Sequence, residues 1–365
     1  MILDLFKEIN FKILIPALFI YFTSLITINS TISNLFFNHL IYFFVGLIIF
    51  ISLTKIDASF FIKNSIYFYL MVMTLLLLVY LIGHTTLGAS RWLKLGELSI
   101  QPSEFAKVSL IFLLTKVWVG DQGWNFKFLN IKKSFFQLKN KFIQSLILFL
   151  PLVTFVLVQP DLGTSIIIFL IFLNILIFSP FSKKYLLYFF IFFAIFSSYF
   201  WNFLQEYQKE RVIIFLNPEI DKYGAGYNSI QSTIAVGSGG LFGKGYSKGT
   251  QTQLNFLPIF WTDFLVATYS EEWGFIGLIF FIGVYAFFLR EISNVALKTQ
   301  EPIYKYISIG ILTYFGFQFV INVGMNIGMM PVTGIPVPFF SYGGTSLISS
   351  FFLLGVINKI SVEKV

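Results

Sequence analysis

Asp263 is the acidic residue whose surroundings best suit chemistry. It follows an extended stretch that contains Pro258, and it stands at the start of an apolar segment, residues 264–289, that is expected to span a membrane as a helix. A carboxylate at such a boundary is partly removed from water yet within reach of a large polar substrate, and desolvation raises the pKa of an acid. Asp263 could therefore act as a general base. The alternative is that Asp263, with Thr262 before it, only caps the helix.

Glu104 and Lys107 form an ionisable pair at the start of another apolar segment. They stand one helical turn apart, on one face of the expected helix, where they can pair. Ser103 is a suitable N-cap for this helix, and Glu104 complements the positive end of the helix. Because charges at membrane depth are costly, the pair either fixes the helix or acts directly on a substrate.

Three further acids lie within or beside apolar segments. Asp161, in the sequence QPDLG, opens one such segment and is expected to anchor the N-terminus of its helix. Glu271 and Glu272 lie roughly two turns inside residues 264–289. At least one of these two should face a cavity lined by protein or water.

The residue types that are scarce exclude several kinds of site. The chain has no Cys, which excludes disulfides, thiolate metal sites and Cys nucleophiles. Its two His residues, His39 and His84, are far apart in sequence, so a His-based metal cluster is not expected and any bound metal would need oxygen ligands. The net charge of +8 occurs without a basic stripe that is interleaved with aromatic residues in a polar region, so no nucleic-acid partner is expected.

The composition indicates a membrane protein. Of the 365 residues, 57% are apolar and 12% are charged, outside the range of ordinary soluble domains. Windows of about 19 residues predict an all-α, polytopic protein that forms a single membrane domain over residues 1–365. The ten expected spans are 11–28, 35–53, 65–83, 104–119, 142–158, 162–179, 185–204, 264–289, 303–327 and 339–358.

The distribution of Lys and Arg predicts the orientation. Most of the 25 basic residues fall in short segments that share one side if the N-terminus is cytoplasmic, so the topology is predicted as N-in and C-in. Two outer segments then stand out: residues 84–103, which suit a short re-entrant or interfacial hairpin, and residues 205–263, a large loop between the seventh and eighth spans. Its glycine run, GSGGLFGKG (237–245), lacks the ending of a phosphate loop, although its N–H groups could form a nest for phosphate oxygens.

Seven motifs occur in order along the chain, from the third span to the last. They are GASRWL (88–93), QPSEFAK (101–107), QPDLGTS (159–165), GAGYNSIQSTIAVGSGGLFGKGYSKGTQTQLNFLP (224–258), TDF (262–264), EEWGFIG (271–277) and NIGMMPVTGIPVPFFSYGGTS (326–346). With this set the chain resembles the SEDS family, and more closely its members that act in cell elongation than those that act in division. The first two spans match only in hydrophobicity.

This resemblance implies a peptidoglycan glycosyltransferase that polymerises lipid II on the outer side of the bacterial cytoplasmic membrane. It also implies a class B penicillin-binding protein as partner, along with other membrane proteins of the elongation complex. The family's catalytic aspartate falls on Asp263, its intramembrane pair on Glu104 and Lys107, and its first outer basic residue on Arg91. One departure is the apolar run 259–261, IFW, where the family has polar residues, so the pKa of Asp263 is expected to depend more on an apolar setting.

The chemistry of this transfer needs only one carboxylate, because the leaving group is a stable diphosphate anion and needs no acid, unlike that of a glycosidase. Asp263 would take the proton from the acceptor 4-hydroxyl, which attacks the donor anomeric carbon with inversion. The candidates for holding the pyrophosphate are Arg91, Arg211, Lys244 and Lys248. For the two lysines, the alternative is a solvated loop face. No cofactor is required, although a divalent cation, Mg²⁺ or Mn²⁺, could assist through Asp263 and pyrophosphate oxygens.

Two other classes of function remain open. A lipid II flippase would also need many spans and buried charges, but the sequence has no convincing inverted repeat, and its outer loop has no inner counterpart of similar size. A non-catalytic scaffold that recruits cell-wall enzymes is the second alternative.

Overall fold

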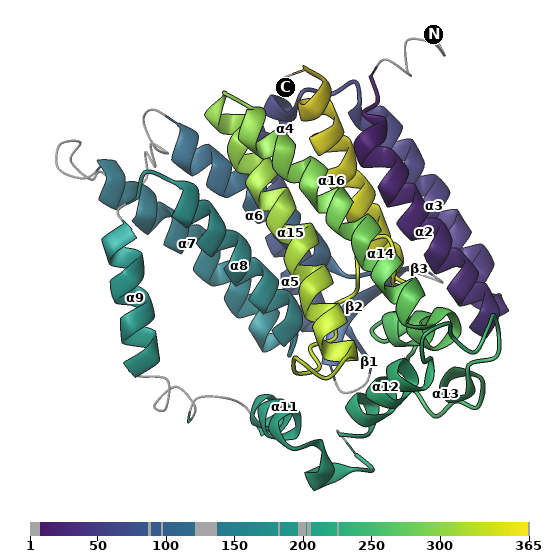
Figure 1. Cartoon of the computed structure of the whole chain (residues 1–365). Helices are drawn as coiled ribbons and strands as arrows, with labels where there is room; N and C mark the ends of the chain where they lie inside the picture. Colours follow the sequence, from purple (N-terminus) through teal and green to yellow (C-terminus); the bar gives the residue numbers. More distant parts are fainter. Residues whose placement is uncertain are drawn as a thin grey trace.

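The computed structural model describes residues 8–86, 89–95, 98–120, 137–181, 183–195, 202, 206–224 and 226–363. The chain is mostly helical, and Figure 1 shows the long helices packed side by side in a bundle. The long helices are α2 (Phe11–Thr31), α3 (Ser33–Leu53), α5 (Ser65–Ile82), α6 (Pro102–Val119), α7 (Gln137–Val158), α8 (Leu162–Phe178), α9 (Lys183–Ile195), α14 (Leu265–Lys298), α15 (Pro302–Asn326) and α16 (Gly344–Glu363). The short ones are α4 (Ala58–Lys63), α11 (Glu206–Leu216), the 3₁₀ helix η2 (Pro218–Asp221), α12 (Tyr227–Ser238) and α13 (Thr250–Gln253).

The membrane-protein prediction is confirmed. Among the described residues, seven helices are long and apolar enough to cross a membrane, and α8 is a shorter apolar helix. Each of the ten predicted spans coincides with a helix, although the last helix begins at Gly344 rather than at 339. The predicted span 185–204 begins as α9, but most of it beyond Ile195 lies outside the described residues.

Both ends of the described chain lie at one end of the bundle. The backbone N–H of Asn10 donates to Asn358 Oδ1 over 2.7 Å, and Asn358 Nδ2 donates to the Glu8 carbonyl over 2.8 Å. Figure 1 shows α11–α13 and a small sheet at the opposite end. Two termini on one side agree with an even number of crossings, while the side of the membrane on which they lie stays a prediction.

The small sheet corresponds to the hairpin predicted for residues 84–103. Strands β1 (His84–Thr86), β2 (Ala89–Leu95) and β3 (Leu98–Ile100) form an antiparallel sheet in the order β1-β2-β3. The sheet leads directly into α6, and it is a minor addition to a helical fold. Its middle strand carries Arg91.

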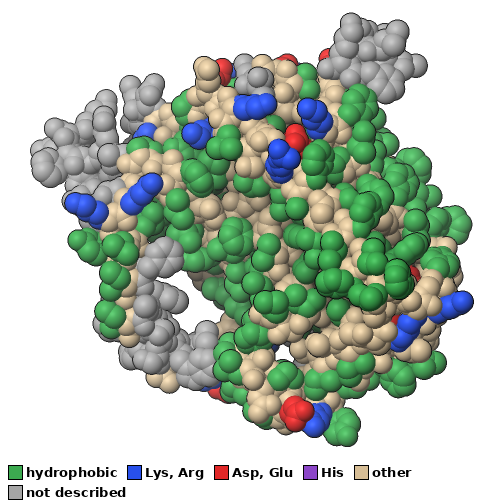
Figure 2. Space-filling view, in the orientation of Figure 1, with side chains coloured by type: hydrophobic (Ala, Val, Ile, Leu, Met, Phe, Trp, Pro, Cys, Tyr) green, Lys and Arg blue, Asp and Glu red, His purple; other side chains and the backbone are tan. Residues whose placement is uncertain are grey.

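The surface of the bundle has an apolar belt between more polar ends. In Figure 2, hydrophobic side chains cover the middle of the visible face, and Lys and Arg side chains lie mainly toward the end that carries the termini. Within the long helices α3 and α5 the exposed side chains include Phe37, Ile48, Tyr67 and Ile82. Such residues face the lipid in a membrane-spanning bundle.

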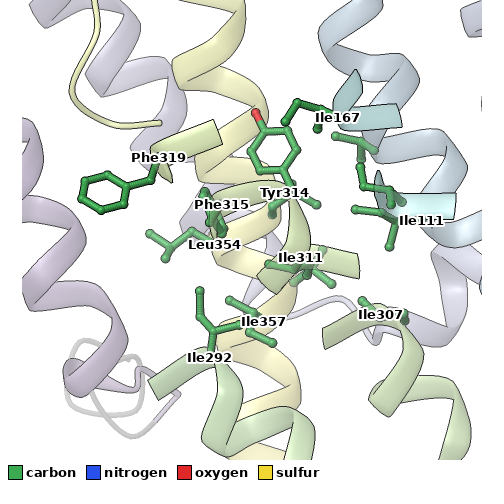
Figure 3. Packing of buried hydrophobic residues seen from close by; sticks show 14 of the residues in the cluster. Ile111, Ile167, Ile292, Ile307, Ile311, Tyr314, Phe315, Phe319, Leu354 and Ile357 are labelled. Atoms are coloured by element: carbon green, nitrogen blue, oxygen red, sulfur yellow. The ribbon is translucent and has the colours of Figure 1, made fainter. Parts of the chain in front are cut away.

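Helix α15 lies at the centre of the bundle. In the most apolar 18-residue stretch of α15, 72% of the residues are buried, whereas the corresponding share is 22% in α3, at the periphery. Figure 3 shows Ile311 and Phe315 of α15 in one buried apolar cluster with Ile111 of α6, Ile292 of α14 and Leu354 of α16. A central helix of this kind can present polar side chains to several neighbours without exposing them to lipid.

The predicted pair of Glu104 and Lys107 is a buried ion pair. Lys107 Nζ lies 2.7 Å from Glu104 Oε1, and the two side chains are 0% and 2% exposed. The ammonium also donates to Gln318 Oε1 over 2.9 Å, and the Tyr314 hydroxyl donates to Glu104 Oε2 over 3.2 Å. Ser349 of α16 donates to the same Glu104 oxygen. The pair therefore joins α6, α15 and α16 in the core, which favours the structural alternative.

We expect Lys107→Met to lower the free energy of unfolding by about 3–5 kcal/mol, because the buried Glu104 carboxylate would lose its cation. The double variant Glu104→Gln/Lys107→Met removes both charges and should recover much of this loss. Thermal unfolding of purified protein in detergent measures both.

The control for this experiment is Lys209→Met, which breaks an i,i+3 pair whose Glu206 side chain is 84% exposed. This change should alter stability by less than about 1 kcal/mol. A Lys107→Met protein as stable as the parent would show that the pair does not hold the bundle together.

Candidate functional site

Asp263 lies directly before α14, and its carboxylate does not cap that helix. The N-cap position is Phe264, and α14 has no side-chain cap hydrogen bond. Asp263 is partly buried, and its neighbour Phe264 clusters with Ala235 of α12, a helix at the end of the bundle opposite to the termini (Figure 1). The capping alternative therefore does not explain why an acid stands here.

Charged groups from separate elements act on the Asp263 carboxylate. Burial raises its pKa from 3.8 to about 6, a hydrogen bond with the Thr262 side chain opposes the rise, and the charges of Arg91 and Arg211 also lower the pKa. Asp161 raises it slightly by repulsion. The structure thus brings together residues from β2, α11 and the start of α8 around a carboxylate whose pKa is set mainly by loss of water.

Both arginines are held by backbone carbonyls. The Arg91 guanidinium donates to the carbonyls of Gln159, at 3.4 Å, and Pro160. Arg211 Nη1 donates to the Val332 carbonyl over 3.0 Å. Because the carbonyl acceptors of Arg91 are neutral, its guanidinium charge can still attract an anion that enters beside Asp263.

Asp161 anchors α8, as predicted. Its Oδ1 accepts from the Thr164 N–H over 3.2 Å at the helix N-terminus. Its Oδ2 accepts from Gln101 Nε2 and from the Ser103 hydroxyl, both over 3.1 Å. The prediction that Ser103 caps its own helix is wrong: the N-cap of α6 is Gln101, and the Ser103 hydroxyl links α6 to α8 instead.

The stretch before Asp263 packs as an apolar layer. Phe260 is 3% exposed and clusters with Leu257, Phe264 and Ala235. The carbonyl of Trp261 accepts from the Tyr342 N–H over 3.0 Å, which joins this stretch to the residues before α16. The expected apolar setting of Asp263 is present in the structure.

The 327–343 segment, which connects α15 to α16 without helix, covers the site. A Cβ atom placed on Gly334 would lie 3.4 Å from Asp263 Oδ2, so the backbone of this segment runs beside the carboxylate. The start of α8 packs against the same place, because a Cβ atom on Gly163 would overlap Ile335 and Thr333.

Sequence reasoning missed Asn322 and Asn326, which are fully buried on α15. The side-chain Nδ2 atoms of both residues donate to the backbone carbonyl of Asp263, each over 3.0 Å. The signal that could have revealed them is their i,i+4 spacing, which puts two amides on one face of a mostly apolar helix.

Lys244 pairs with Glu271 rather than joining the group around Asp263. Lys244 Nζ lies 2.7 Å from Glu271 Oε1, and the Glu271 side chain is 0% exposed. The same oxygen accepts from the Gln251 N–H and the Thr250 hydroxyl. Lys248 is exposed. Among the described residues, the charges that act on Asp263 do not include either lysine.

The glycine loop, residues 239–249, is bound to a break in α14. At Gly274 the helix has a φ of 70°, and a Cβ atom there would overlap Gly243 N. The N–H groups of Lys244 and Gly245 donate to the carbonyls of Glu271 and Glu272, while the N–H of Phe275 donates to the Gly240 carbonyl over 2.8 Å. The Glu272 side chain also accepts from the Ser247 N–H over 3.1 Å, so the side chains of both predicted buried acids contact this loop.

An apolar hollow of about 510 Å³ lies between α2 and α14. Its wall includes Phe19 and Ile26 of α2, Trp273 and Phe280 of α14, and Phe242 of the glycine loop. It can take an apolar chain.

The described residues contain no group of three or more His, Asp or Glu side chains that could hold a metal ion.

Comparison with known proteins agrees with this arrangement. The family of FtsW, RodA and SpoVE cell cycle proteins matches residues 4–365. The chain belongs to this family. The resemblance seen in the motifs is confirmed.

Curated relatives of the FtsW/RodA/SpoVE chain are peptidoglycan glycosyltransferases. MrdB of Escherichia coli K12 is 35% identical over 321 residues, which cover 88% of this chain and 84% of the relative. RodA of Treponema pallidum is 30% identical over 422 residues, covering 96% and 95%.

Solved structures share the fold of this family member. A chain from a peptidoglycan synthase complex, described for its coordination of polymerization and crosslinking, has a TM-score of 0.80 and 28% identity, and the match covers 96% of this chain and 97% of that one. The crystal structure of RodA from Thermus thermophilus has a TM-score of 0.70 at 24% identity, and the match covers 98% and 97%.

We expect Lys244→Met to release the glycine loop, because the buried Glu271 carboxylate would lose its only ion-pair partner within the described residues. Chymotrypsin should then cut faster after Phe242 or Tyr246, as followed by gel and mass spectrometry. The double variant Lys244→Met/Glu271→Gln should regain protection, and Lys222→Met, in an exposed pair with Glu219, should cut like the parent. Equal cutting of Lys244→Met and the parent would exclude the role of this pair in seating the loop.

Proposed function

We propose that this chain is a peptidoglycan glycosyltransferase that polymerises lipid II into glycan strands during cell elongation, with Asp263 as the general base. The names of its relatives support the activity. The observation that carries the assignment of the base is the setting of Asp263: a partly buried carboxylate with a pKa near neutrality, beside two arginines. A base poised near the working pH is effective in proton transfer.

In the proposed reaction, Asp263 accepts the proton of the acceptor 4-hydroxyl as that oxygen attacks the anomeric carbon of the donor. The new glycosidic bond forms with inversion, the bond between the anomeric carbon and the diphosphate oxygen breaks, and the electron pair leaves with the lipid diphosphate. Arg91 and Arg211 are suited to the departing charge because a guanidinium binds phosphate oxygens in a bidentate manner. Lys244 and Lys248 would act at most on parts of the substrate farther away.

The proposed location is the bacterial cytoplasmic membrane, with the site on its outer side. The chain has several apolar helices, and its relatives are bacterial cell-wall synthases. The predicted orientation puts the termini inside and therefore Asp263, at the opposite end, outside.

The proposed partner is a class B penicillin-binding protein, alongside other membrane proteins of the elongation complex. It is supported by the related chain of known structure, which comes from a synthase complex that couples polymerization to crosslinking.

The proposed steps do not require a divalent cation. Asp161, the acid that acts on Asp263, already accepts hydrogen bonds from Gln101, Ser103 and Thr164. Asp263 would thus be the one available carboxylate in this group of described residues, and Mg²⁺ sites in proteins are usually held by one or two carboxylates together with substrate phosphates. Any Mg²⁺ or Mn²⁺ would be held mainly by the substrate.

We expect Asp263→Asn to lower the polymerisation rate by about 10²–10⁴-fold, because general bases contribute on this order. The assay uses purified protein with its penicillin-binding partner and labelled lipid II, with glycan products separated on gels. Asp57→Asn, at the end that carries the termini, is the matched control and should polymerise at the parent rate.

The same assay separates the alternatives. Transbilayer movement of lipid II without any glycan product from the parent protein would favour a flippase, and neither activity would favour a scaffold. An Asp263→Asn protein that polymerises like the parent would exclude Asp263 as the base.

We expect kcat/KM to fall at low pH with a midpoint at about pH 6, the pKa of Asp263, because the base must be deprotonated to act. Since Arg211 lowers this pKa, Arg211→Gln should move the midpoint to higher pH. Initial rates measured from pH 4.5 to 8.5 with subsaturating lipid II would show both effects. A midpoint near the ordinary value for an aspartate, or a downward shift in Arg211→Gln, would contradict the assignment.

A further inference from the structure

The backbone of Asp263 is clamped by two asparagines of α15. Asn322 Nδ2 and Asn326 Nδ2 each donate to the Asp263 carbonyl over 3.0 Å, and both side chains are 0% exposed. Buried amides with well-made hydrogen bonds have one orientation, because every other orientation leaves a polar group without a partner.

Asn326 occupies the place of the first hydrogen bond that α14 would make if it began earlier. In a continuous helix, the N–H of Ala267 would donate to the carbonyl of Asp263, four residues before it. Here Ala267 N–H donates to Asn326 Oδ1 over 3.0 Å, while Asn326 Nδ2 donates to the Asp263 carbonyl. The Asn326 side chain thus stands between the Ala267 N–H and the Asp263 carbonyl. Asp263 therefore stays outside the helix, and its side chain does not have to point in the direction that a helical backbone would impose.

Asn322 ties the same carbonyl to the 327–343 segment. Its Nδ2 also donates to the Ile335 carbonyl over 2.6 Å. Ile335 follows Gly334, the residue that lies beside the Asp263 carboxylate. One amide group therefore fixes both the backbone of the aspartate and the strip of chain that runs beside its carboxylate.

Neighbouring contacts hold the clamp itself in place. Asn326 Nδ2 also donates to the Asn322 carbonyl over 2.8 Å, and the Asn326 carbonyl accepts from the Ser232 hydroxyl of α12 over 2.9 Å. The clamp therefore joins α12, α14, α15 and the 327–343 segment at the backbone of Asp263.

We propose that Asn322 and Asn326 are positioning residues for the general base, acting through the Asp263 backbone to set the direction and the water exposure of its carboxylate. This inference rests on the proposed function of Asp263 as a base. The charged groups that face the carboxylate are Arg91 of β2, Arg211 of α11 and Asp161 before α8, and the clamp substitutions replace none of them.

The variants Asn322→Leu and Asn326→Leu remove the donors at similar side-chain volume. We expect each to lower kcat by about a hundredfold, the scale of a small misplacement of a reacting group, with KM within about threefold of the parent. We also expect the acid midpoint of kcat/KM to move to lower pH, because a loosened carboxylate regains water and its pKa returns toward the ordinary value. The control is Asn174→Leu, which breaks an amide-to-carbonyl bond of 3.1 Å inside α8, and it should match the parent in rate and midpoint.

The experiment measures lipid II polymerisation against pH for the parent and the three variants in complex with the penicillin-binding partner, and thermal unfolding in detergent for each. If a leucine variant does not fold, Asn322→Ser takes its place, since it shortens the side chain beyond reach of both carbonyls. A folded variant with the parent rate and the parent midpoint overturns the proposal. Loss of rate with an unshifted midpoint, or loss of folding in all the clamp variants, assigns the clamp a structural role only and also overturns it. An inactive parent protein would instead contradict the proposed function.

Discussion

Polar groups that lie away from water must find their partners inside the protein, and this constraint organises the structure. Glu104 and Lys107 meet it fully: each charge has the other, and amide and hydroxyl groups complete the set. Asp263 meets it only in part. Its backbone is held tightly. Its carboxylate has a hydrogen bond with the Thr262 side chain and is close to the charges of two arginines, but together these do not offset the rise in pKa that burial causes. A satisfied charge stabilises a bundle, whereas an incompletely satisfied one keeps a pKa near neutrality and remains available for proton transfer.

Both arrangements depend on one stripe of α15. Tyr314, Gln318, Asn322 and Asn326 follow each other at intervals of four residues, so they lie along one face of the helix. The first two contact the Glu104–Lys107 pair, and the last two hold the Asp263 carbonyl. A single central helix thus connects the ion pair in the core to the proposed base at the end of the bundle. Because α15 is shielded by α6, α8, α14 and α16, such a polar face can exist without exposure to lipid.

Those parts of the site that carry charge could be predicted from the sequence. Asp263, Asp161 and the Glu104–Lys107 pair interrupt apolar runs, and a charge in such a run stands out whatever the fold. The asparagines could not be found this way, because a neutral amide scarcely alters the hydropathy of a window. Nor could the partner of Lys244 be predicted, since Glu271 comes 27 residues later and meets it only through the break at Gly274. The bundle followed from hydrophobicity, while the docking of the glycine loop and the 327–343 segment depends on backbone contacts that leave no periodic pattern.

The two arginines beside Asp263 would help the proposed reaction by binding the diphosphate but hinder it by lowering the pKa of the base. Binding of the substrate would remove the hindrance. Without an anion present, their positive charges lower the pKa of Asp263 and so weaken it as a base. In the proposed reaction, a diphosphate would occupy the same guanidinium groups and offset their charge. The pKa of Asp263 would then rise toward the value that burial alone imposes, since the apolar layer of Phe260 and its neighbours stays in place. The base would thus be strongest when the donor is bound, and this coupling needs no movement of the backbone that Asn322 and Asn326 hold.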